Sequence, residues 1–372
     1  WMVKYCILLF VCISLVNGGE VVPLPENVMR GIAITPDGPL TLKDYALSIQ
    51  LDEAINIGAD WIFVNAYVSQ WNGTSSKVFK GPQTPLDSVL KSFVSEAKTK
   101  GLKVLLKPLI IPLDGSSWLL LDPEYPNDWF ESYTDILLSY CELLPELDAL
   151  SIGLELLSLT MHPKYHDDWN NLIQQVREHT DAKLTYSSLF ELEVFGISFW
   201  NQLDWIGIDE YVPVATEDNP FPSVEKMTET ISDYFTMVSN FRMAQNLTSK
   251  PVVITEMGIY SYTNATFVPS LFPPGLKTCN GSYYGNYTTQ QVYFEAQFAA
   301  IQQHLDLITG VFMYHFDNPS TSDYCRPCNV KSGDPPSNHS TVIPDDDDEL
   351  FGRKYECGLT FRGKPGMQTV IQ

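Results

Sequence analysis

Positive charge is scarce in this 372-residue chain, where 23 lysines and arginines face 45 aspartates and glutamates and the formal net charge is −22. A surface this acidic repels phosphate backbones, so nucleic acid is excluded as the expected partner. The usual glycine-rich phosphate-binding patterns are also missing. At 44% hydrophobic and 12% aromatic residues, the chain can still bury one large core or the cores of two domains.

Histidine is also scarce, with six in the chain, and no G-x-S-x-G pattern occurs, so a serine triad has no anchor. His162 and His166 stand four residues apart, but the segment lacks the glutamate of a metalloprotease helix, and helix-cap residues are the better interpretation. The acidic run after Pro344 lacks the spacing of an EF-hand. We therefore expect neither a metal nor a cofactor.

Long apolar runs are missing except at the N-terminus, where Tyr5–Val16 follows Lys4 and precedes the small residue Gly18. This pattern is typical of a secretory signal over residues 1–18, and it is short for a membrane span. A signal anchor is the alternative. We expect the mature protein to begin near Gly19, to have no membrane segment after cleavage, and to be secreted or to remain in the lumen of the secretory pathway.

Secretion predicts glycosylation and disulfide bonds. Six N-x-S/T sequons are present: Asn72, Asn246, Asn264, Asn280, Asn286 and Asn338. Of seven cysteines, Cys6 and Cys12 leave with the signal, and Cys141 is expected to be a buried free thiol. The other four are expected to form two disulfides, with the pairing left open: Cys279, Cys325, Cys328 and Cys357. A zinc site at the C-x-x-C is disfavoured because no second C-x-x-C or histidine pair accompanies it.

Short apolar segments alternate with longer amphipathic ones along the rest of the chain. The pattern predicts strands over 29–35, 60–68, 103–111, 149–156, 183–190, 204–212, 251–259 and 310–316. It predicts helices over 41–58, 85–101, 128–144, 165–180, 223–246 and 288–305, with a weaker connector over 191–203.

The fold class follows from these segments. Near-continuous apolar strands are typical of parallel sheets, which are buried on both faces. Eight β-α repeats in a chain of this length favour an α/β protein with a single-domain (β/α)8 TIM barrel, and an open doubly wound sheet is the alternative. Residues 317–357 are expected to form a long loop on the top face, pinned by the disulfides.

Two of the apolar strands end on a carboxylate: Glu155 closes “LSIGLE” and Glu256 closes “PVVITE”. Burying a carboxylate is costly unless it is neutral, paired or at an edge. In a TIM barrel the carboxyl ends of the strands meet at one mouth, where the chemistry takes place. Glycoside hydrolysis needs one carboxyl group to protonate the leaving oxygen and another to attack the anomeric carbon or activate water. A salt bridge or helix cap would explain a lone glutamate, but this pair favours catalysis.

The chain resembles glycoside hydrolase family 113 of clan A, whose known members are retaining β-1,4-mannanases. The resemblance covers about Arg30 to Pro365 and is carried, in order, by “GLKVLLKP”, “DGSSW”, “DWFESY”, “SIGLEL”, “WIGIDEYVPV”, “KPVVITEMGIYS” and “GLTFRGKPG”. It implies that residues 19–372 form one glycoside hydrolase barrel with Glu155 as acid/base and Glu256 as nucleophile. It also implies that Tyr211 orients the nucleophile carboxylate, a core aromatic at the mouth being the alternative.

Four further residues are candidates for substrate contact. Trp71 and Trp118 follow strands two and three and offer aromatic faces to a sugar, with ordinary loop packing as the alternative. Lys107, near the end of strand three, is expected to touch substrate or a carboxylate. His315 lies in “MYHF”, the segment that replaces the tryptophans which floor the sugar site in the family.

Two strand-end positions depart from the family pattern. Leu154 stands where family members have threonine, and Leu109 stands where they have histidine. Part of the sugar-reading shell is therefore changed. Asp209 and Glu210 both end strand six, and strand alternation allows only one of them to face the mouth.

Three functions are compatible with the sequence. The first is a secreted retaining β-glycoside hydrolase, endo-acting on β-1,4-mannan or a related β-linked polysaccharide. The second is a clan-A glycosidase for another β-glucan or glycan. The third is a catalytically weak, glycan-binding barrel. Each takes a polysaccharide or oligosaccharide as its partner, and we expect a monomer.

Overall fold

The computed structural model describes residues 24–35, 45–270 and 286–314. Several sequence-based expectations lie outside the described residues: the signal at 1–18, the loop at 317–357, His315, the sequons Asn280 and Asn338, and the cysteines Cys279, Cys325, Cys328 and Cys357.

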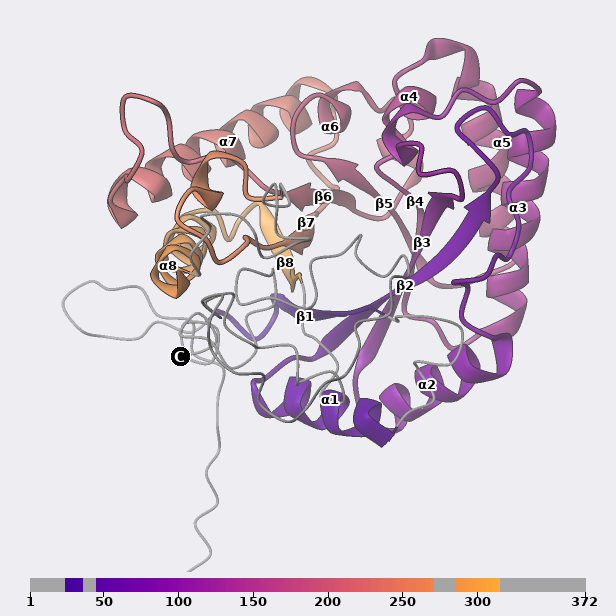
Figure 1. Cartoon of the computed structure of the whole chain (residues 1–372), viewed down its shortest axis with the longest axis horizontal. Helices are drawn as coiled ribbons and strands as arrows, with labels where there is room; N and C mark the ends of the chain where they lie inside the picture. The colour runs from indigo at the N-terminus through magenta and orange to yellow at the C-terminus, as the bar shows by residue number, and fades with distance from the viewer. Residues whose placement is uncertain (1–23, 36–44, 271–285, 315–372) are drawn as a thin grey trace, which may run out of the picture.

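Eight parallel strands close into a barrel in sequence order, with the eighth strand paired to the first (Figure 1). The strands are β1 (Met29–Ile34), β2 (Trp61–Gln70), β3 (Lys103–Pro112), β4 (Ala149–Leu154), β5 (Lys183–Leu189), β6 (Ile206–Glu210), β7 (Val252–Met257) and β8 (Ile308–Met313). Each coincides with an expected strand to within a few residues. The (β/α)8 barrel is confirmed, and the open sheet is excluded.

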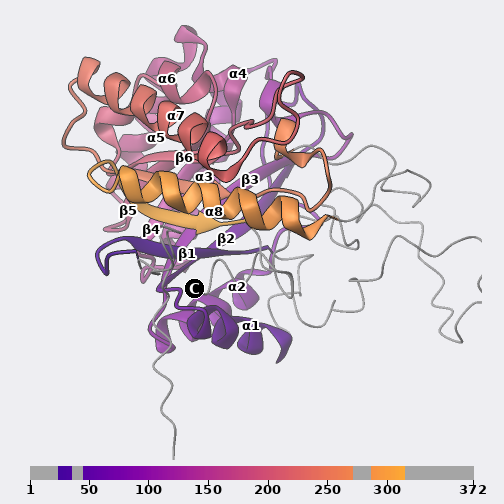
Figure 2. The same ribbon diagram turned by 90° about the vertical axis from the view of Figure 1, so that its left-hand side faces the viewer.

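Helices surround the barrel on its outside (Figures 1 and 2). The longer ones are α1 (Tyr45–Asn56), α2 (Asp87–Thr99), α3 (Pro126–Leu143), α5 (His166–Arg177), α7 (Val224–Ala244) and α8 (Tyr287–Gln303). Short turns are α4 (Leu157–Thr160), α6 (Glu193–Gly196), η2 (Trp118–Leu120), η3 (Pro163–Tyr165), η4 (Trp200–Gln202) and η5 (Ala265–Phe267). The weak 191–203 connector is thus folded as α6 and η4. Within the described ranges, no helix is both long and apolar enough to cross a membrane.

The outer helices pack through apolar faces of helical spacing, as α2 illustrates. Its buried side chains are Val89, Leu90, Phe93, Val94 and Ala97. The helix stops before Gly101, whose φ of +87° suits glycine.

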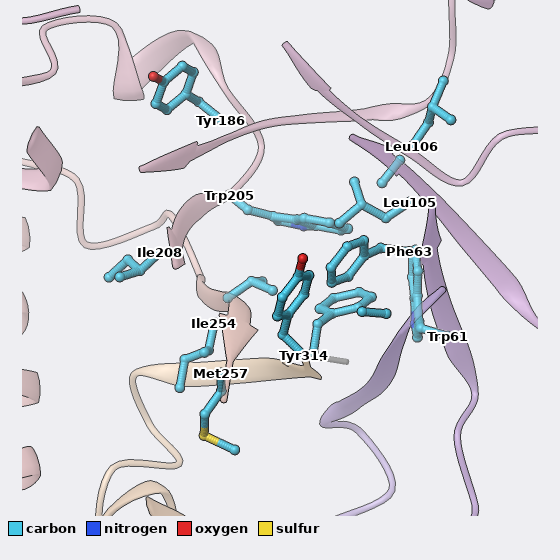
Figure 3. Close-up of a cluster of buried hydrophobic side chains, with 14 of the residues drawn as sticks. Trp61, Phe63, Leu105, Leu106, Tyr186, Trp205, Ile208, Ile254, Met257 and Tyr314 are labelled. Carbon is cyan, nitrogen blue, oxygen red and sulfur yellow. The ribbon is translucent and has the colours of Figure 1, made fainter. Parts of the chain in front are cut away.

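Aromatic rings fill the interior of the barrel (Figure 3). Trp61, at the start of β2, meets Trp205 edge to face with ring centroids 5.7 Å apart. Two residues further along β2, Phe63 stacks on Tyr314 at 6.2 Å. Burial of such large rings contributes strongly to core stability. They form a solid floor, so any substrate must bind above them at the carboxyl ends of the strands.

Candidate active site

Both expected catalytic glutamates follow an irregularity in their strands. The register of β4 against β5 shifts between Ser151 and Leu154, just before Glu155. The register of β7 against β6 shifts as well. Ile208 of β6 pairs with Ile254, and the next residue of β6, Asp209, pairs with Glu256. A β-bulge of this kind inserts one residue and re-aims the side chain that follows, and bulges are frequent beside active sites.

The backbone of Glu155 lies in the left-handed region, with φ of +50°. For a residue other than glycine this conformation costs roughly 1–2 kcal/mol. Its N–H donates to the carbonyl oxygen of Ser187 at 2.9 Å. Its half-buried side chain accepts a hydrogen bond on Oε2 from Nε1 of Trp118 at 3.3 Å. The mouth tryptophan of η2 therefore contacts the expected acid/base directly.

The surroundings of Glu155 favour its protonated form. Burial is the largest cause raising the pKa of Glu155 well above its ordinary value, and the negative charges of Asp209, Glu256 and Glu193 raise it further. The ammonium of Lys107 opposes them without cancelling the effect. A carboxyl group that keeps its proton near neutral pH can serve as a general acid.

Glu256 is held by two hydrogen-bond donors. Nζ of Lys107 donates to Oε1 at 2.7 Å, and the hydroxyl of Tyr211 donates to Oε2 at 2.9 Å. The Glu256 residue is 7% exposed. Both of its oxygens therefore act as acceptors in a fixed geometry, and the contact from Tyr211 is the one that the family resemblance implies.

Lys107 is a buried cation shared by two carboxylates. Besides Glu256, its Nζ donates to Asp209 Oδ1 at 3.1 Å and to the carbonyl oxygen of Thr255 at 3.3 Å. The ammonium also lies 4.5 Å from the ring centroid of Phe63. Burial acts to lower the pKa of Lys107, but Asp209 and Glu256 together raise it. Of the two partners expected for this lysine, the structure therefore shows the carboxylate.

Asp209 belongs to the site although the sequence did not single it out. Its Oδ1 accepts a hydrogen bond from Oγ1 of Thr255 at 2.6 Å. Burial, followed by the charge of Glu256, raises its pKa to about 7. Glu210 is also buried, but its Oε1 accepts from the N–H of Val212 at 3.0 Å. Asp209 thus faces Lys107 while the next side chain does not, as strand alternation requires. The sequence did contain one signal for Asp209: it stands two residues before Tyr211, so both side chains are expected on the same side of the chain.

The two departures from the family pattern lie in one small apolar cluster. Leu109 and Leu154 pack there with Tyr67 and Ile111, and the partly buried Trp118 packs against the cluster. The polar positions of the family are thus replaced by an apolar surface directly beside Glu155.

Trp71, the second expected aromatic platform, is 65% exposed. Its ring contacts that of Phe79, with centroids 4.9 Å apart. It lines a groove with Ser75 and, from α3, Asp128. Of the two tryptophans, Trp118 is the one bonded to Glu155.

Four sequons fall on described residues. Asn72, Asn246 and Asn264 are exposed, while Asn286 is half-buried and its side chain caps α8. Cys141 is a buried free thiol whose pKa is raised to about 11, chiefly by burial.

The histidine pair lies at the beginnings of two helical segments, with His162 just before η3 and His166 as the first residue of α5. The ring of His162 accepts from the N–H of Lys164 and caps η3, the capping role expected for it. No group of three or more potential metal ligands gathers among the residues that the structure describes.

A closed (β/α)8 barrel with glutamates at the carboxyl ends of β4 and β7 has the architecture of a glycoside hydrolase. The model of Glycoside Hydrolase Family 113 matches residues 41–324, and the chain belongs to that family. The matched range includes both glutamates. Membership of a glycoside hydrolase family implies a carbohydrate substrate.

Solved structures share the fold at low sequence identity. A complex of a GH113 β-1,4-mannanase has a TM-score of 0.69 and 17% identity, covering 93% of this chain and 98% of that one. The GH113 β-mannanase of Alicyclobacillus acidocaldarius in complex with ManMIm has a TM-score of 0.67 and 17% identity, covering 93% and 95%. A β-glucuronidase of Faecalibacterium prausnitzii has a TM-score of 0.55 and 14% identity, covering 93% and 48%. No curated protein sequence matches the chain.

Proposed function

We propose that the protein is a retaining β-glycosidase that cleaves β-1,4-mannan, or a closely related β-linked polysaccharide, within the chain. Glu155 is its acid/base and Glu256 its nucleophile. The observation that carries the proposal is the contrast between the two glutamates. Burial and the neighbouring negative charges raise the pKa of Glu155, whereas Glu256 receives hydrogen-bond donors on both oxygens.

The reaction proceeds in two steps. In the first, a carboxylate oxygen of Glu256 bonds to the anomeric carbon, the glycosidic C–O bond breaks, and Glu155 gives its proton to the leaving oxygen. In the second, Glu155 takes a proton from water, whose oxygen bonds to the anomeric carbon and releases Glu256. Lys107 and Tyr211 hold the nucleophile in place through both steps, and the N–H of Trp118 orients Glu155.

The substrate follows from the family and from one local difference. Mannan is the first candidate because the chain belongs to family 113. The apolar cluster of Tyr67, Leu109, Ile111 and Leu154 beside the acid/base favours a second candidate. This second candidate is another β-linked glycan, one that presents an apolar face to Leu109 and Leu154, where the mannanases of the family have polar side chains.

A panel of soluble mannan, glucomannan, xylan and mixed-linkage β-glucan tests the proposal. Reducing ends released by the wild type are compared with those released by Glu155→Ala and Glu256→Ala. Glu178→Ala, which removes an exposed carboxylate at the end of α5, is the matched control. We expect Glu256→Ala to be inactive on every polysaccharide and Glu178→Ala to match the wild type. A wild type inactive on all four, or an active Glu256→Ala, would refute the proposal.

We also propose that the enzyme is secreted, glycosylated and monomeric, with two disulfides among Cys279, Cys325, Cys328 and Cys357. The leader pattern at residues 1–18 and the sequons support this proposal. Thiol labelling of the secreted, unreduced protein is expected to modify Cys141 alone, after denaturation. Labelling of any of the four other cysteines would contradict the disulfides.

A further inference from the structure

A further buried carboxylate, Glu193, lies behind the β4 end of the site. Its Oε1 accepts from the hydroxyl of Tyr186 at 2.7 Å and from Oγ1 of Thr160 at 2.6 Å. Its Oε2 accepts from the N–H of Leu189 at 2.8 Å. All three partners donate, so Glu193 acts as an acceptor on both oxygens, the pattern of an ionised carboxylate. The glycosidase steps above do not use it.

The hydroxyl of Tyr186 carries this arrangement to the backbone beside Glu155. It accepts a hydrogen bond from the N–H of Leu156 at 2.6 Å. Thr160 closes the same turn, because its Oγ1 also contacts the carbonyl oxygen of Leu156 at 3.2 Å. The N–H of Leu156 is therefore linked to Glu193 through Tyr186, and the carbonyl oxygen of Leu156 is linked to Glu193 through Thr160.

The ring of Tyr186 has little freedom to move. It is fully buried and meets the rings of Trp169, Phe199 and Trp200 at centroid distances of 5.9, 5.9 and 6.3 Å. It points away from the aromatic cluster inside the barrel (Figure 3). A Cβ on Gly153 would lie 2.7 Å from this ring, so the bulge of β4 packs tightly against it. The Tyr186 side chain, which lies behind Glu155, is therefore held in place by tight packing.

We propose that Glu193, Tyr186 and Thr160, here called the Glu193 clamp, are positioning residues for the acid/base Glu155. The clamp holds the α4 turn so that Glu155 keeps its left-handed backbone and its carboxyl group at the mouth. This inference rests on the proposed role of Glu155. It adds an electrostatic function as well. Burial raises the pKa of Glu193 while its three hydrogen-bond donors act to lower it, and once ionised Glu193 disfavours the ionised form of Glu155 from behind.

Other charges act on Glu155 from the opposite side. Asp209 from β6, Glu256 from β7 and Lys107 from β3 are the charged groups that face it beside Glu193. Glu193 itself is contacted by one titratable side chain in the described structure, that of Tyr186 on β5. Replacing Glu193 alone leaves the other three charges in place, so its contribution to the pH profile can be isolated.

Leaving-group dependence distinguishes positioning of the acid from general stability. The probes are 2,4-dinitrophenyl and phenyl β-mannobiosides, since the first leaving group departs without a proton and the second needs one. In Tyr186→Phe and in Thr160→Val, we expect kcat/KM to fall about 10- to 100-fold for the phenyl substrate. For the dinitrophenyl substrate we expect a change of less than about threefold, because general acid assistance is not needed there.

Tyr140→Phe is the matched control, since it removes another buried tyrosine hydroxyl, on α3 under the ammonium of Lys80. Tyr140→Phe is expected to leave kcat/KM unchanged for both substrates. An equal loss on both substrates, or no loss in either clamp variant, would overturn the inference. If the wild type folds normally but hydrolyses neither mannobioside, the result counts against the proposed function. The clamp is then tested by the next measurement, which needs no activity.

That measurement is a 13C NMR titration of Glu155 in glutamate-labelled protein, which needs no turnover. In Glu193→Gln we expect the pKa of Glu155 to fall, and in an active enzyme the alkaline limb of kcat/KM to move to lower pH by the same amount. Glu178→Gln is expected to leave both unchanged. An unchanged pKa of Glu155 in Glu193→Gln would refute the electrostatic part of the inference.

Discussion

The ammonium of Lys107 lies 2.7 Å from Oε1 of Glu256, and the lysine side chain is completely buried. Asp209 binds the same ammonium at 3.1 Å. One buried cation therefore serves two buried carboxylates. Removing one member of such a cluster leaves the other buried charges without a partner. This costs more stability than replacing the whole cluster by apolar side chains would.

Lys107→Met is expected to destabilise the protein by about 3–5 kcal/mol at neutral pH, because Asp209 and Glu256 lose their shared partner. Combining it with Asp209→Asn should restore part of that loss, since one uncompensated charge is removed. Urea unfolding of both variants at pH 7 and pH 5 measures this. The loss should be smaller at pH 5, which is below the pKa of about 7 of Asp209, because that carboxyl group is then protonated. A single variant as stable as the wild type at pH 7 would show that the cation does not stabilise this cluster.

Tyr211→Phe removes the donor to Oε2 of Glu256 and preserves the ring. A hydrogen bond to a charged group contributes about 1.5–3 kcal/mol, so kcat/KM should fall roughly 10- to 150-fold. The loss should be similar for substrates with good and poor leaving groups, because the nucleophile acts on both. Steady-state kinetics with the two mannobiosides checks this, and a loss confined to the poor leaving group would assign Tyr211 to the acid instead.

Trp118→Phe keeps an aromatic face at the mouth but removes the N–H that donates to Glu155. That donor stabilises the ionised carboxylate, so its loss should raise the pKa of Glu155. The alkaline limb of kcat/KM should then move to higher pH by roughly half a unit to one unit. This is the opposite sign to Glu193→Gln. A shift to lower pH in Trp118→Phe would mean that the indole does not act through its N–H.

Glu210 should make the folded protein less stable as the pH rises. Burial raises its pKa from 4.5 to about 7. A carboxyl group with a raised folded-state pKa contributes stability that is present below about pH 4.5 and lost as the pH rises through about 7. Relative to the wild type, Glu210→Gln should therefore gain about 3 kcal/mol in unfolding free energy between pH 4.5 and pH 8. Denaturant titrations across that range measure the difference, and a pH-independent difference would contradict the assignment.

The sequence contained enough to predict the barrel and the two strand-end glutamates. Buried parallel strands are continuous apolar runs, so the segments ending at Glu155 and Glu256 stand out. Strand alternation also predicted that only one of Asp209 and Glu210 faces the mouth, although it did not say which. These features depend on local pattern, which a single sequence displays directly.

Other parts of the site depend on contacts that no local pattern encodes. The bulges before Glu155 and Glu256 have no composition signal, and the two-carboxylate partnership of Lys107 joins three strands. Glu193 lies in the weak connector after β5, where hydrophobic periodicity is absent, and its link to Leu156 runs through a tyrosine on another strand. Only the closed barrel brings these groups together.

The central claim is that Glu155 and Glu256 act as a retaining pair, and the anomer formed first in hydrolysis tests it most directly. Proton NMR at early times would follow the reducing end released by wild-type protein from β-1,4-mannohexaose, or from the β-linked oligosaccharide cleaved fastest. The two-step mechanism predicts that the β-anomer appears first and converts to the α-anomer only by slow mutarotation. Initial appearance of the α-anomer would contradict the account, because inversion requires one direct displacement by water and no bond to Glu256.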